Sequence, residues 1–185
     1  MSDSSRPSNN LDTSRLIATP DEVAVEPIPK DQASVLDNLV ELYAHDFSEH
    51  VPLLLKPNGR FDVALADNWW TEGHFPFFLR WKGQLAGFAL VRRGSRVTGA
   101  ADVMDVAELF VARGFRKRKV GALAAHAIFT AFPGRWDIRV RQTNAAAKIF
   151  WSHVAATWVG RAVPSVPFST DGVEWNVFHL PSAPS

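Results

Sequence analysis

Residues 107–123 read AELFVARGFRKRKVGAL, and along this stretch a strand pattern gives way to a helix pattern. The apolar run from Val103 to Ala112 is rich in β-branched and aromatic residues and predicts a strand. From Val120 onward, apolar residues recur every three to four positions, as on one face of an amphipathic helix. The turn between them holds one glycine and a group of cations: Arg113, Arg116, Lys117, Arg118 and Lys119. Because the first N–H groups of a helix lack internal partners and the helix dipole favours negative charge there, this arrangement predicts a phosphate-binding site.

Two common phosphate-binding loops do not fit this turn, because Walker A and the dinucleotide fingerprint both require glycines that it lacks. The segment Arg116-Lys117-Arg118-Lys119-Val120-Gly121 does resemble the acetyl-CoA pyrophosphate loop of the GNAT superfamily of N-acetyltransferases, usually written Arg/Gln-x-x-Gly-x-Gly/Ala. Gly121 matches the second glycine, whereas Lys119 replaces the first. Glycine there lets the backbone approach the pyrophosphate closely, so Lys119 either hinders that approach or compensates for it with its ammonium.

A second motif follows at the separation that the family shows. After a predicted strand from Trp136 to Arg141, the chain reads Asn144-Ala145-Ala146-Ala147-Lys148-Ile149-Phe150-Trp151. The family's usual form is Asn-x-x-Ala-x-x-Phe-Tyr. Asn144, Ala147 and Phe150 match it, and Trp151 stands where tyrosine is commonest. With both motifs in place, the chain is identified as resembling a GNAT-type acetyltransferase.

The resemblance implies a fold, a co-substrate and a set of binding residues. The fold is α/β (α+β), with a mixed, mainly antiparallel central sheet and helices on both faces. Acetyl-CoA is the co-substrate, and the backbone at Leu109, Phe110 and Val111 would hold its pantetheine arm and thioester. The remaining positions expected to contact it are Arg116, Lys117, Arg118, Lys119, Val120, Gly121, Ala122, Asn144, Ala147, Phe150 and Trp151. Asn144 would also be placed to cap the last helix, and for Phe150 a place in the core is the alternative.

The remaining periodicities predict one domain with tails. Residues 1–20 are rich in Ser, Asn, Asp and Pro and predict a disordered tail, residues 21–181 a single acetyltransferase domain, and residues 182–185 a frayed end. Within the domain we expect a strand at 23–27, a helix capped by Asp31 and stopped by Pro52, and strands at 76–81 and 85–92. A closing hairpin is expected from strands at 158–163 and 173–180.

Acetyl transfer to an amine requires a base to take the excess proton, and the central strand offers Glu108 and Asp105. Glu108 is the first candidate, because a carboxylate inside an apolar strand is costly to bury unless it is paired or functional. Strand alternation places the two acids on opposite faces, unless a bulge intervenes. Trp151 cannot protonate a leaving thiolate as a tyrosine would. His153 titrates in a suitable range and is the candidate acid, with an ordinary surface histidine as the alternative.

Composition limits the partners. The sequence has no cysteine, which excludes a disulfide scaffold or a thiol nucleophile and fits a cytoplasmic protein. No apolar run is long enough to span a membrane, and the histidine spacing indicates no metal site. Residues 31–72 hold eight acidic residues against two basic ones, whereas the rest of the chain to residue 185 is basic. This asymmetry predicts CoA binding in the second half and a cationic acceptor at the first helix, and for any single acid a solvated position on the helix face is the alternative.

Three functions remain open on the sequence alone. The first is an N-acetyltransferase that moves an acetyl group from acetyl-CoA to a primary amine, of a small molecule or a protein, by direct attack in a ternary complex. The second is a degenerate relative that binds CoA or acyl-CoA without turnover, because Lys119 and Trp151 depart from the motifs. The third, a nucleic-acid-binding module using cations 113–119, ranks last because no aromatic residues alternate with them as stacking platforms. The closing hairpin could also pair two chains as a homodimer.

Overall fold

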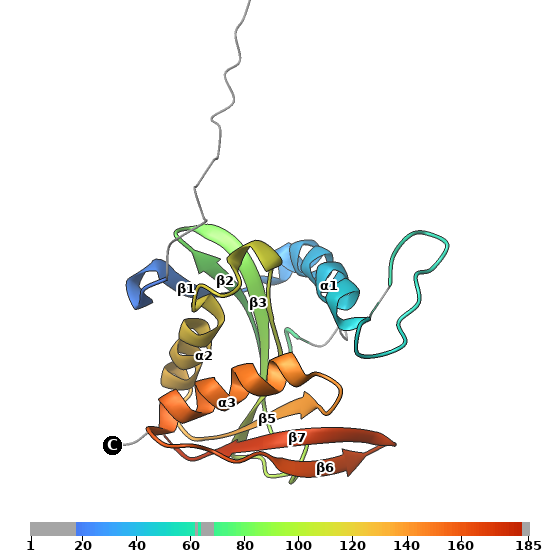
Figure 1. Cartoon of the computed structure of the whole chain (residues 1–185). Helices are drawn as coiled ribbons and strands as arrows, with labels where there is room; N and C mark the ends of the chain where they lie inside the picture. Colours follow the sequence, from blue (N-terminus) through green and yellow to red (C-terminus); the bar gives the residue numbers. More distant parts are fainter. Residues whose placement is uncertain (1–17, 62, 64–68, 183–185) are drawn as a thin grey trace, which may run out of the picture.

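The computed structural model describes residues 18–61, 63 and 69–182. In that part of the chain one seven-stranded sheet carries three α-helices (Figure 1). The strands are β1 (Val23–Pro27), β2 (His74–Trp81), β3 (Gln84–Arg93), β4 (Val103–Val111), β5 (Arg135–Arg141), β6 (Val166–Thr170) and β7 (Val173–Leu180). The helices are α1 (Ala33–Phe47), α2 (Val120–Ala131) and α3 (Ala145–Val159), with short 3₁₀ turns at Pro20–Glu22, Lys30–Gln32 and Arg113–Phe115. None of the described helices is long and apolar enough to cross a membrane.

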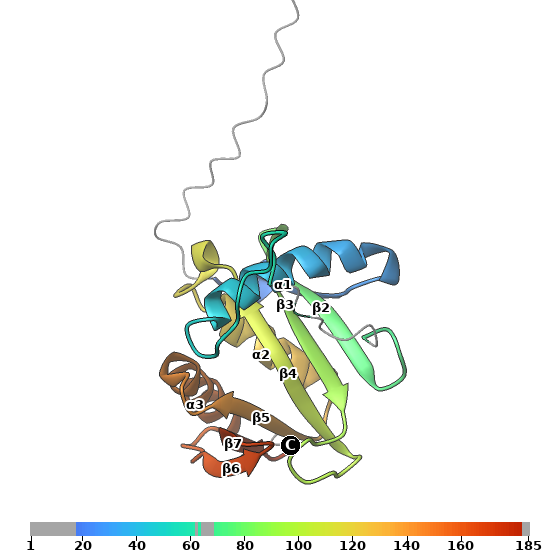
Figure 2. The ribbon, with the colours of Figure 1, turned by 90° about the vertical axis from the view of Figure 1, so that its right-hand side faces the viewer.

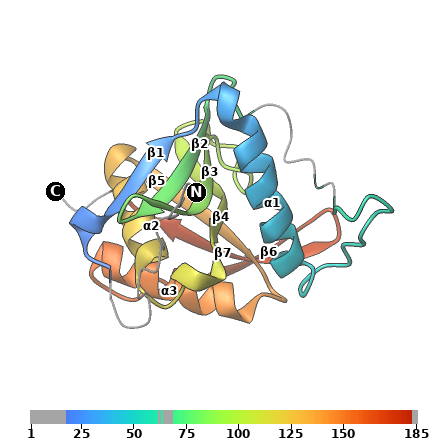
Figure 3. The same cartoon turned by 90° about the horizontal axis from the view of Figure 1, so that it is seen from above.

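The sheet is mainly antiparallel, as predicted. Its strand order is β1-β2-β3-β4-β5-β7-β6, and β4–β5 is the parallel pair. Helix α1 covers one face, and α2 and α3 cover the other (Figure 3). Each face has its own core, since Leu36 and Val40 of α1 pack with Phe88, whereas Ile128 and Val154 pack with Val91 from the opposite face of β3. The two cores follow from the period-two alternation of the central strands.

The two central strands separate halfway along their length. Pairing between β4 and β5 runs from Val103 with Arg135 to Val106 with Ile138 and stops there. Beyond that point the strands diverge, which is visible in Figure 2 as a wedge between β4 and β5. On its other side, β4 stays paired with β3, and a Cβ at Gly87 would lie 1.9 Å from the carbonyl oxygen of Phe110. Only glycine permits that approach, so Gly87 helps to hold β4 against β3 where β5 has left it.

The closing hairpin starts later than the sequence predicts. Residues 158–159 complete α3, which ends at Gly160 in the left-handed conformation, so the predicted strand at 158–163 is wrong. The first strand of the hairpin is β6, which contains Pro167 and forms the sheet edge, a position where proline is tolerated. Asp171 and Gly172, both with positive φ, make the two-residue turn into β7.

The first helix and the N-terminal tail also have bounds that differ from the predicted ones. Asp31 lies inside a 3₁₀ turn, and α1 begins after Gln32 without a side-chain cap, so Asp31 does not cap this helix. The helix ends at Phe47, before Pro52 is reached. Most of the predicted tail, residues 1–17, lies outside the described residues, as do 183–185. Ala18 is buried, and its N–H donates to the carbonyl of Arg118 (2.8 Å), so the folded part begins no later than this residue.

Candidate active site

A bulge in β4 brings the two predicted acids to the same face of the sheet. Leu90 pairs with Glu108 and Val91 with Val106, which leaves Ala107 as an extra residue in β4. As a result both Asp105 and Glu108 face the α1 side, and strand alternation alone would have separated them. Asp105 is fully buried and accepts a hydrogen bond from Arg92 (3.0 Å), so it serves as the counter-ion of a buried guanidinium. Glu108 accepts its hydrogen bond from Tyr43 instead of from an arginine.

Tyr43, the one tyrosine of the sequence, holds Glu108 in place. Its hydroxyl donates to Oε2 of Glu108 at 2.5 Å, and its ring contacts Phe47, Phe88 and Phe110. Burial raises the pKa of Glu108 above its ordinary value, while the hydrogen bond from Tyr43 offsets part of that rise. Burial and the neighbouring carboxylate also raise the pKa of Tyr43, which keeps its proton. A carboxylate with a raised pKa and a fixed orientation is what a general base at neutral pH requires.

The N-terminus of α2 has the form of an anion site. Lys119 precedes the helix in the left-handed conformation (φ 67°), which glycine adopts most readily, so it takes up the backbone shape of the missing glycine. In the described part of the chain no side chain caps this helix, which leaves its first N–H groups available. Gly121 is buried, and a Cβ there would lie 3.3 Å from Phe150 and from Val111, so this glycine serves close packing of α2.

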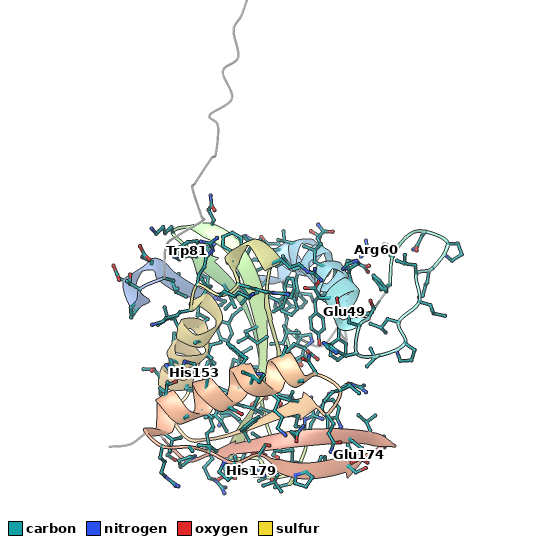
Figure 4. All side chains as sticks on the ribbon, in the orientation of Figure 1. Glu49, Arg60, Trp81, His153, Glu174 and His179 are labelled. Carbon is teal, nitrogen blue, oxygen red and sulfur yellow. The ribbon has the colours of Figure 1, made fainter. Side chains whose placement is uncertain are left out.

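The cations of the basic turn divide into two groups. Arg113 and Arg116 both pair with Asp46 at the end of α1, and Arg116 also donates to the carbonyl of Val111 (2.7 Å). Lys117 and Lys119 are exposed, and no partner among the described residues holds them. Arg118 donates to the carbonyl of Gly114 and stacks over Trp81, which Figure 4 places near the upper end of the sheet. The five cations are therefore not all available to bind an anion. Lys117 and Lys119 are the two whose ammonium groups no described residue holds.

The residues of the second motif cap α3 and pack it against the rest of the protein. Asn144 caps the helix, since its Oδ1 accepts a hydrogen bond from the N–H of Ala147 (2.9 Å). Phe150 is partly buried against Gly121, and Trp151 is buried in the core between α3 and the sheet. His153 is exposed on α3 (Figure 4), across the sheet from Glu108, and no ring contact to the described catalytic candidates is present. Its role as an acid stays a prediction.

Sequence reasoning missed the basic side chains around Glu108. Four arginines come from three places in the chain, Arg92 on β3, Arg96 in the following loop, and Arg139 and Arg141 on β5. Their charges act on Glu108, Tyr43 or Asp105. A signal was present in the alternation Ile138-Arg139-Val140-Arg141, which puts two cations on one strand face. What they face could not be read from the alternation.

Comparison with known proteins decides the family. Residues 36–154 match the model of the acetyltransferase (GNAT) family, which covers well over half of the chain. The chain belongs to this family. It is therefore an acyltransferase, and acetyl transfer to amines is the family's general reaction. No curated protein matches the sequence significantly.

Solved structures of other GNAT acetyltransferases share the fold. An acetyltransferase from Thermus thermophilus superposes with a TM-score of 0.64 at 15% identity, covering 90% of this chain and 99% of that one. The spermidine N-acetyltransferase of Vibrio cholerae, solved with CoA and spermine, gives 0.58 at 9% identity, with 88% and 96% covered. The ribosomal-protein-S18-alanine N-acetyltransferase of Escherichia coli gives 0.54 at 15% identity, also with 88% and 96% covered. At these identities the likeness establishes the fold alone.

The GNAT features of this chain fit acetyl-CoA, the co-substrate of the family. A diphosphate fits the uncapped N-terminus of α2 beside Lys117 and Lys119. The pantetheine arm fits along Leu109–Val111, where the β5 side of β4 has no strand partner. Within residues 18–61, 63 and 69–182, no group of three or more His, Asp or Glu side chains is placed to hold a metal ion.

Proposed function

We propose that this chain transfers an acetyl group from acetyl-CoA to a primary amine by direct attack in a ternary complex, with Glu108 as the base. The observation that carries the proposal is the hydrogen bond from Tyr43 of α1 to Glu108 of β4, next to the point where β4 and β5 separate. The amine belongs to a small molecule or a protein and reaches the site as a cationic ammonium, to which Glu108 offers a carboxylate. Direct attack is favoured because the sequence has no cysteine to carry the acetyl group.

Acetyl-CoA, when bound, supplies an activated thioester carbonyl. The residues of this chain do the rest. The N–H groups at Val120, Gly121 and Ala122, with Lys117 and Lys119, hold the diphosphate. The backbone at Leu109–Val111 orients the thioester, and Glu108 takes the proton that the amine must lose before it can attack. Asp105 keeps the guanidinium of Arg92 in place and takes no proton in this scheme.

The leaving thiolate needs no dedicated acid, because a thiol has a reference pKa of about 8.5 and is a tolerable leaving group near neutral pH. Trp151, which is buried in the core, takes no part in that step. His153, which follows the second motif in the sequence, is the candidate donor of a proton to the thiolate. A cytoplasmic location and a homodimer through the β6–β7 hairpin also remain proposals, and nucleic acid is no partner in this scheme.

The alternative is a protein that binds CoA without turnover, which the departures of Lys119 and Trp151 from the family's motifs favour. Two measurements distinguish it from the transferase. Thermal melting with acetyl-CoA at about 100 times its dissociation constant should show about 2.7 kcal/mol of added stability. Thiol release is then followed with a panel of amines. Stabilisation with amine-dependent release supports the transferase, and stabilisation without release from any amine supports the binding protein. A protein that neither acetyl-CoA nor CoA stabilises would contradict both.

A further inference from the structure

The arginines around Glu108 form a cluster that lies on the α1 face of the sheet, where α1 leaves β5 and β7 uncovered by a helix (Figure 2). We define the arginine cluster as Arg92, Arg96, Arg139 and Arg141. The guanidinium of Arg139 lies 4.9 Å from the ring centre of Trp175 on β7, and that of Arg141 lies 5.1 Å from the same ring. Both guanidinium groups therefore contact the same indole, and this contact favours a fixed position for each of them.

The cluster is short of negative charge. Its four guanidinium groups face two carboxylates, Asp105 and Glu108. Asp137 adds a third carboxylate, which acts on Arg139 and is also hydrogen-bonded to the hydroxyl of Ser95 and the ring of His179, so four cations meet three acids. Burial, and then repulsion from Arg92, lowers the pKa of Arg96. Like charges are held together here without enough anions among the described residues to balance them.

The cluster also has unused hydrogen-bond donors. The Nε atoms of Arg92, Arg139 and Arg141 are buried and have no hydrogen-bond partner among the described residues. The side chain of Arg139 is only 9% exposed, and its nearest carboxylate oxygen lies 3.8 Å from Nε, beyond hydrogen-bond distance. A buried donor on a charged group that lacks a partner is costly, and native proteins rarely leave one unless a ligand or water completes it. Arg96 is exposed and opens the cluster to solvent, whereas Arg92, Arg139 and Arg141 are half-buried.

Two of the acids that suggested a cationic acceptor, Asp46 and Glu41, are engaged within the protein. Asp46 is held by Arg113 and Arg116. Glu41 accepts hydrogen bonds from the side chain of Arg60 and the N–H of Phe61. The field that an acceptor meets beside the base is therefore set by the arginine cluster, and a polyamine would be repelled by it.

We propose that the acceptor amine of this enzyme carries an anionic group, a carboxylate or a phosphate, which the arginine cluster binds while the amine faces Glu108. Guanidinium groups bind both anions through paired N–H donors, and the bound anion would balance the excess charge and use the free Nε donors. This inference rests on the proposed function and narrows its acceptor from primary amines in general to small amino acids or amino phosphates.

The experiment compares amines that differ only in the distal group. Thiol release from acetyl-CoA is measured with 4-aminobutyrate, its carboxamide, 3-aminopropylphosphonate and spermidine. We expect kcat/KM for the carboxylate or the phosphonate to exceed that for the carboxamide by about tenfold or more, since a hydrogen bond to a charged group typically contributes that much. The ratio of the two anions distinguishes carboxylate from phosphate. Equal rates for acid and carboxamide, or a preference for spermidine, would overturn the inference.

Variants of Arg141 and Arg96 test whether the preference for an anion depends on the arginine cluster. Arg141→Gln should remove most of the preference, lowering kcat/KM for the anionic amine about tenfold more than for the carboxamide, and Arg141→Lys should restore it only in part because lysine cannot bind in a bidentate way. Arg96→Gln provides a second test should Arg141→Gln fail to fold. Arg161→Gln, an exposed arginine after α3, is the matched control and should keep the preference unchanged.

A binding measurement separates this inference from the proposed function. The CoA-saturated protein is titrated with 4-acetamidobutyrate and with its carboxamide by calorimetry. If no amine releases thiol but the acid still binds about tenfold more tightly than the carboxamide, and Arg141→Gln abolishes the difference, the anion site stands and the transferase fails. Release with every amine tested and no preference at either step leaves the transferase and removes the anion site.

Discussion

The N-terminus of α2 and the arginine cluster are both cationic, yet they are built in opposite ways. At the helix the charges of Lys117 and Lys119 are exposed and the donors belong to the backbone. In the cluster the side chains of Arg92 and Arg139 are 11% and 9% exposed, Arg139 lies over Trp175, and Arg92 is bonded to Asp105. Exposed charges on flexible stems are screened by salt and tolerate substitution, whereas buried ones act at full strength and tolerate little. Under the two proposals above, the helix end would supply general affinity for a diphosphate, and the α1 face would supply chemistry and selectivity.

The sharpest test of this division is Glu108→Gln, for which we expect the largest effect. Removing a general base should lower kcat by about 10²–10⁴-fold, while the dissociation constant of acetyl-CoA stays unchanged because the helix end is intact. The loss should be greatest above the pKa of Glu108, where the wild-type carboxylate is ionised. Steady-state rates and calorimetric titration of CoA check both parts. A variant with wild-type rates would exclude Glu108 as the base.

The same variant should gain stability, which distinguishes a lost base from a damaged fold. The folded-state pKa of Glu108 is raised, so its contribution to stability is fully present below the ordinary value of 4.5 and is lost as pH rises through the folded pKa. Glutamine carries no charge at any pH and avoids that loss. Urea unfolding should therefore show the variant to be more stable than the wild type at pH 7 and nearly equal to it at low pH.

A smaller effect on the same face is expected for Tyr43→Phe, which removes one hydroxyl and keeps the ring contacts with Phe47, Phe88 and Phe110. Without the donated hydrogen bond the pKa of Glu108 should rise further, because that bond lowers it in the wild type. The acid limb of the kcat/KM profile should then move to higher pH, with a modest loss at neutral pH. An acid limb that does not move would mean that another group controls it.

The N-terminus of α2 could be predicted from the sequence, whereas the site on the α1 face could be predicted only in part. The helix end is local: Arg116 to Gly121 are contiguous, so a motif marks it, and even the substitution of glycine by Lys119 is visible. The α1 face is assembled from α1, four strands (β3, β4, β5 and β7) and a loop. Its key contacts join residues far apart in the chain, such as Tyr43 with Glu108 and Arg139 with Trp175. The bulge at Ala107 that unites Asp105 with Glu108 depends on register with β3, which no local pattern encodes.

Asp46→Asn tests whether the two regions are linked through α1. Asp46 pairs with Arg113 and Arg116 of the basic turn, and its side chain is 17% exposed. Burial alone would raise the pKa of Asp46, but hydrogen bonds from both arginines lower it below its ordinary value. The stability it contributes is therefore present above pH 3.8 and is lost as pH falls through the lowered pKa.

The variant should lose about 1 kcal/mol of unfolding free energy at pH 7, and this difference should shrink at low pH. Asp37→Asn, an exposed acid on the same helix, is the control and should change neither value. Because Arg116 would no longer be held by Asp46, its guanidinium becomes available to the diphosphate, and CoA should bind more tightly at low salt. Weaker CoA binding would instead show that the ion pair orders the turn for its ligand.

The smallest effect is expected at Lys119, where backbone shape and charge can be separated by two substitutions. Lys119 is held at φ 67°, a conformation that costs a residue with a Cβ free energy and that glycine adopts freely. Lys119→Gly should therefore raise the unfolding free energy by about 0.5–1 kcal/mol, whereas Lys119→Ala keeps the Cβ and should leave it nearly unchanged.

Both variants lose the ammonium. If the charge holds the diphosphate, both should bind CoA more weakly and with a smaller dependence on salt; if close backbone approach is what limits binding, Lys119→Gly alone should bind CoA more tightly than the wild type. Thermal unfolding measures the stability of both variants, and calorimetry at two salt concentrations measures their affinity for CoA. Equal stability for the glycine and alanine variants would mean that the left-handed residue before α2 carries no strain.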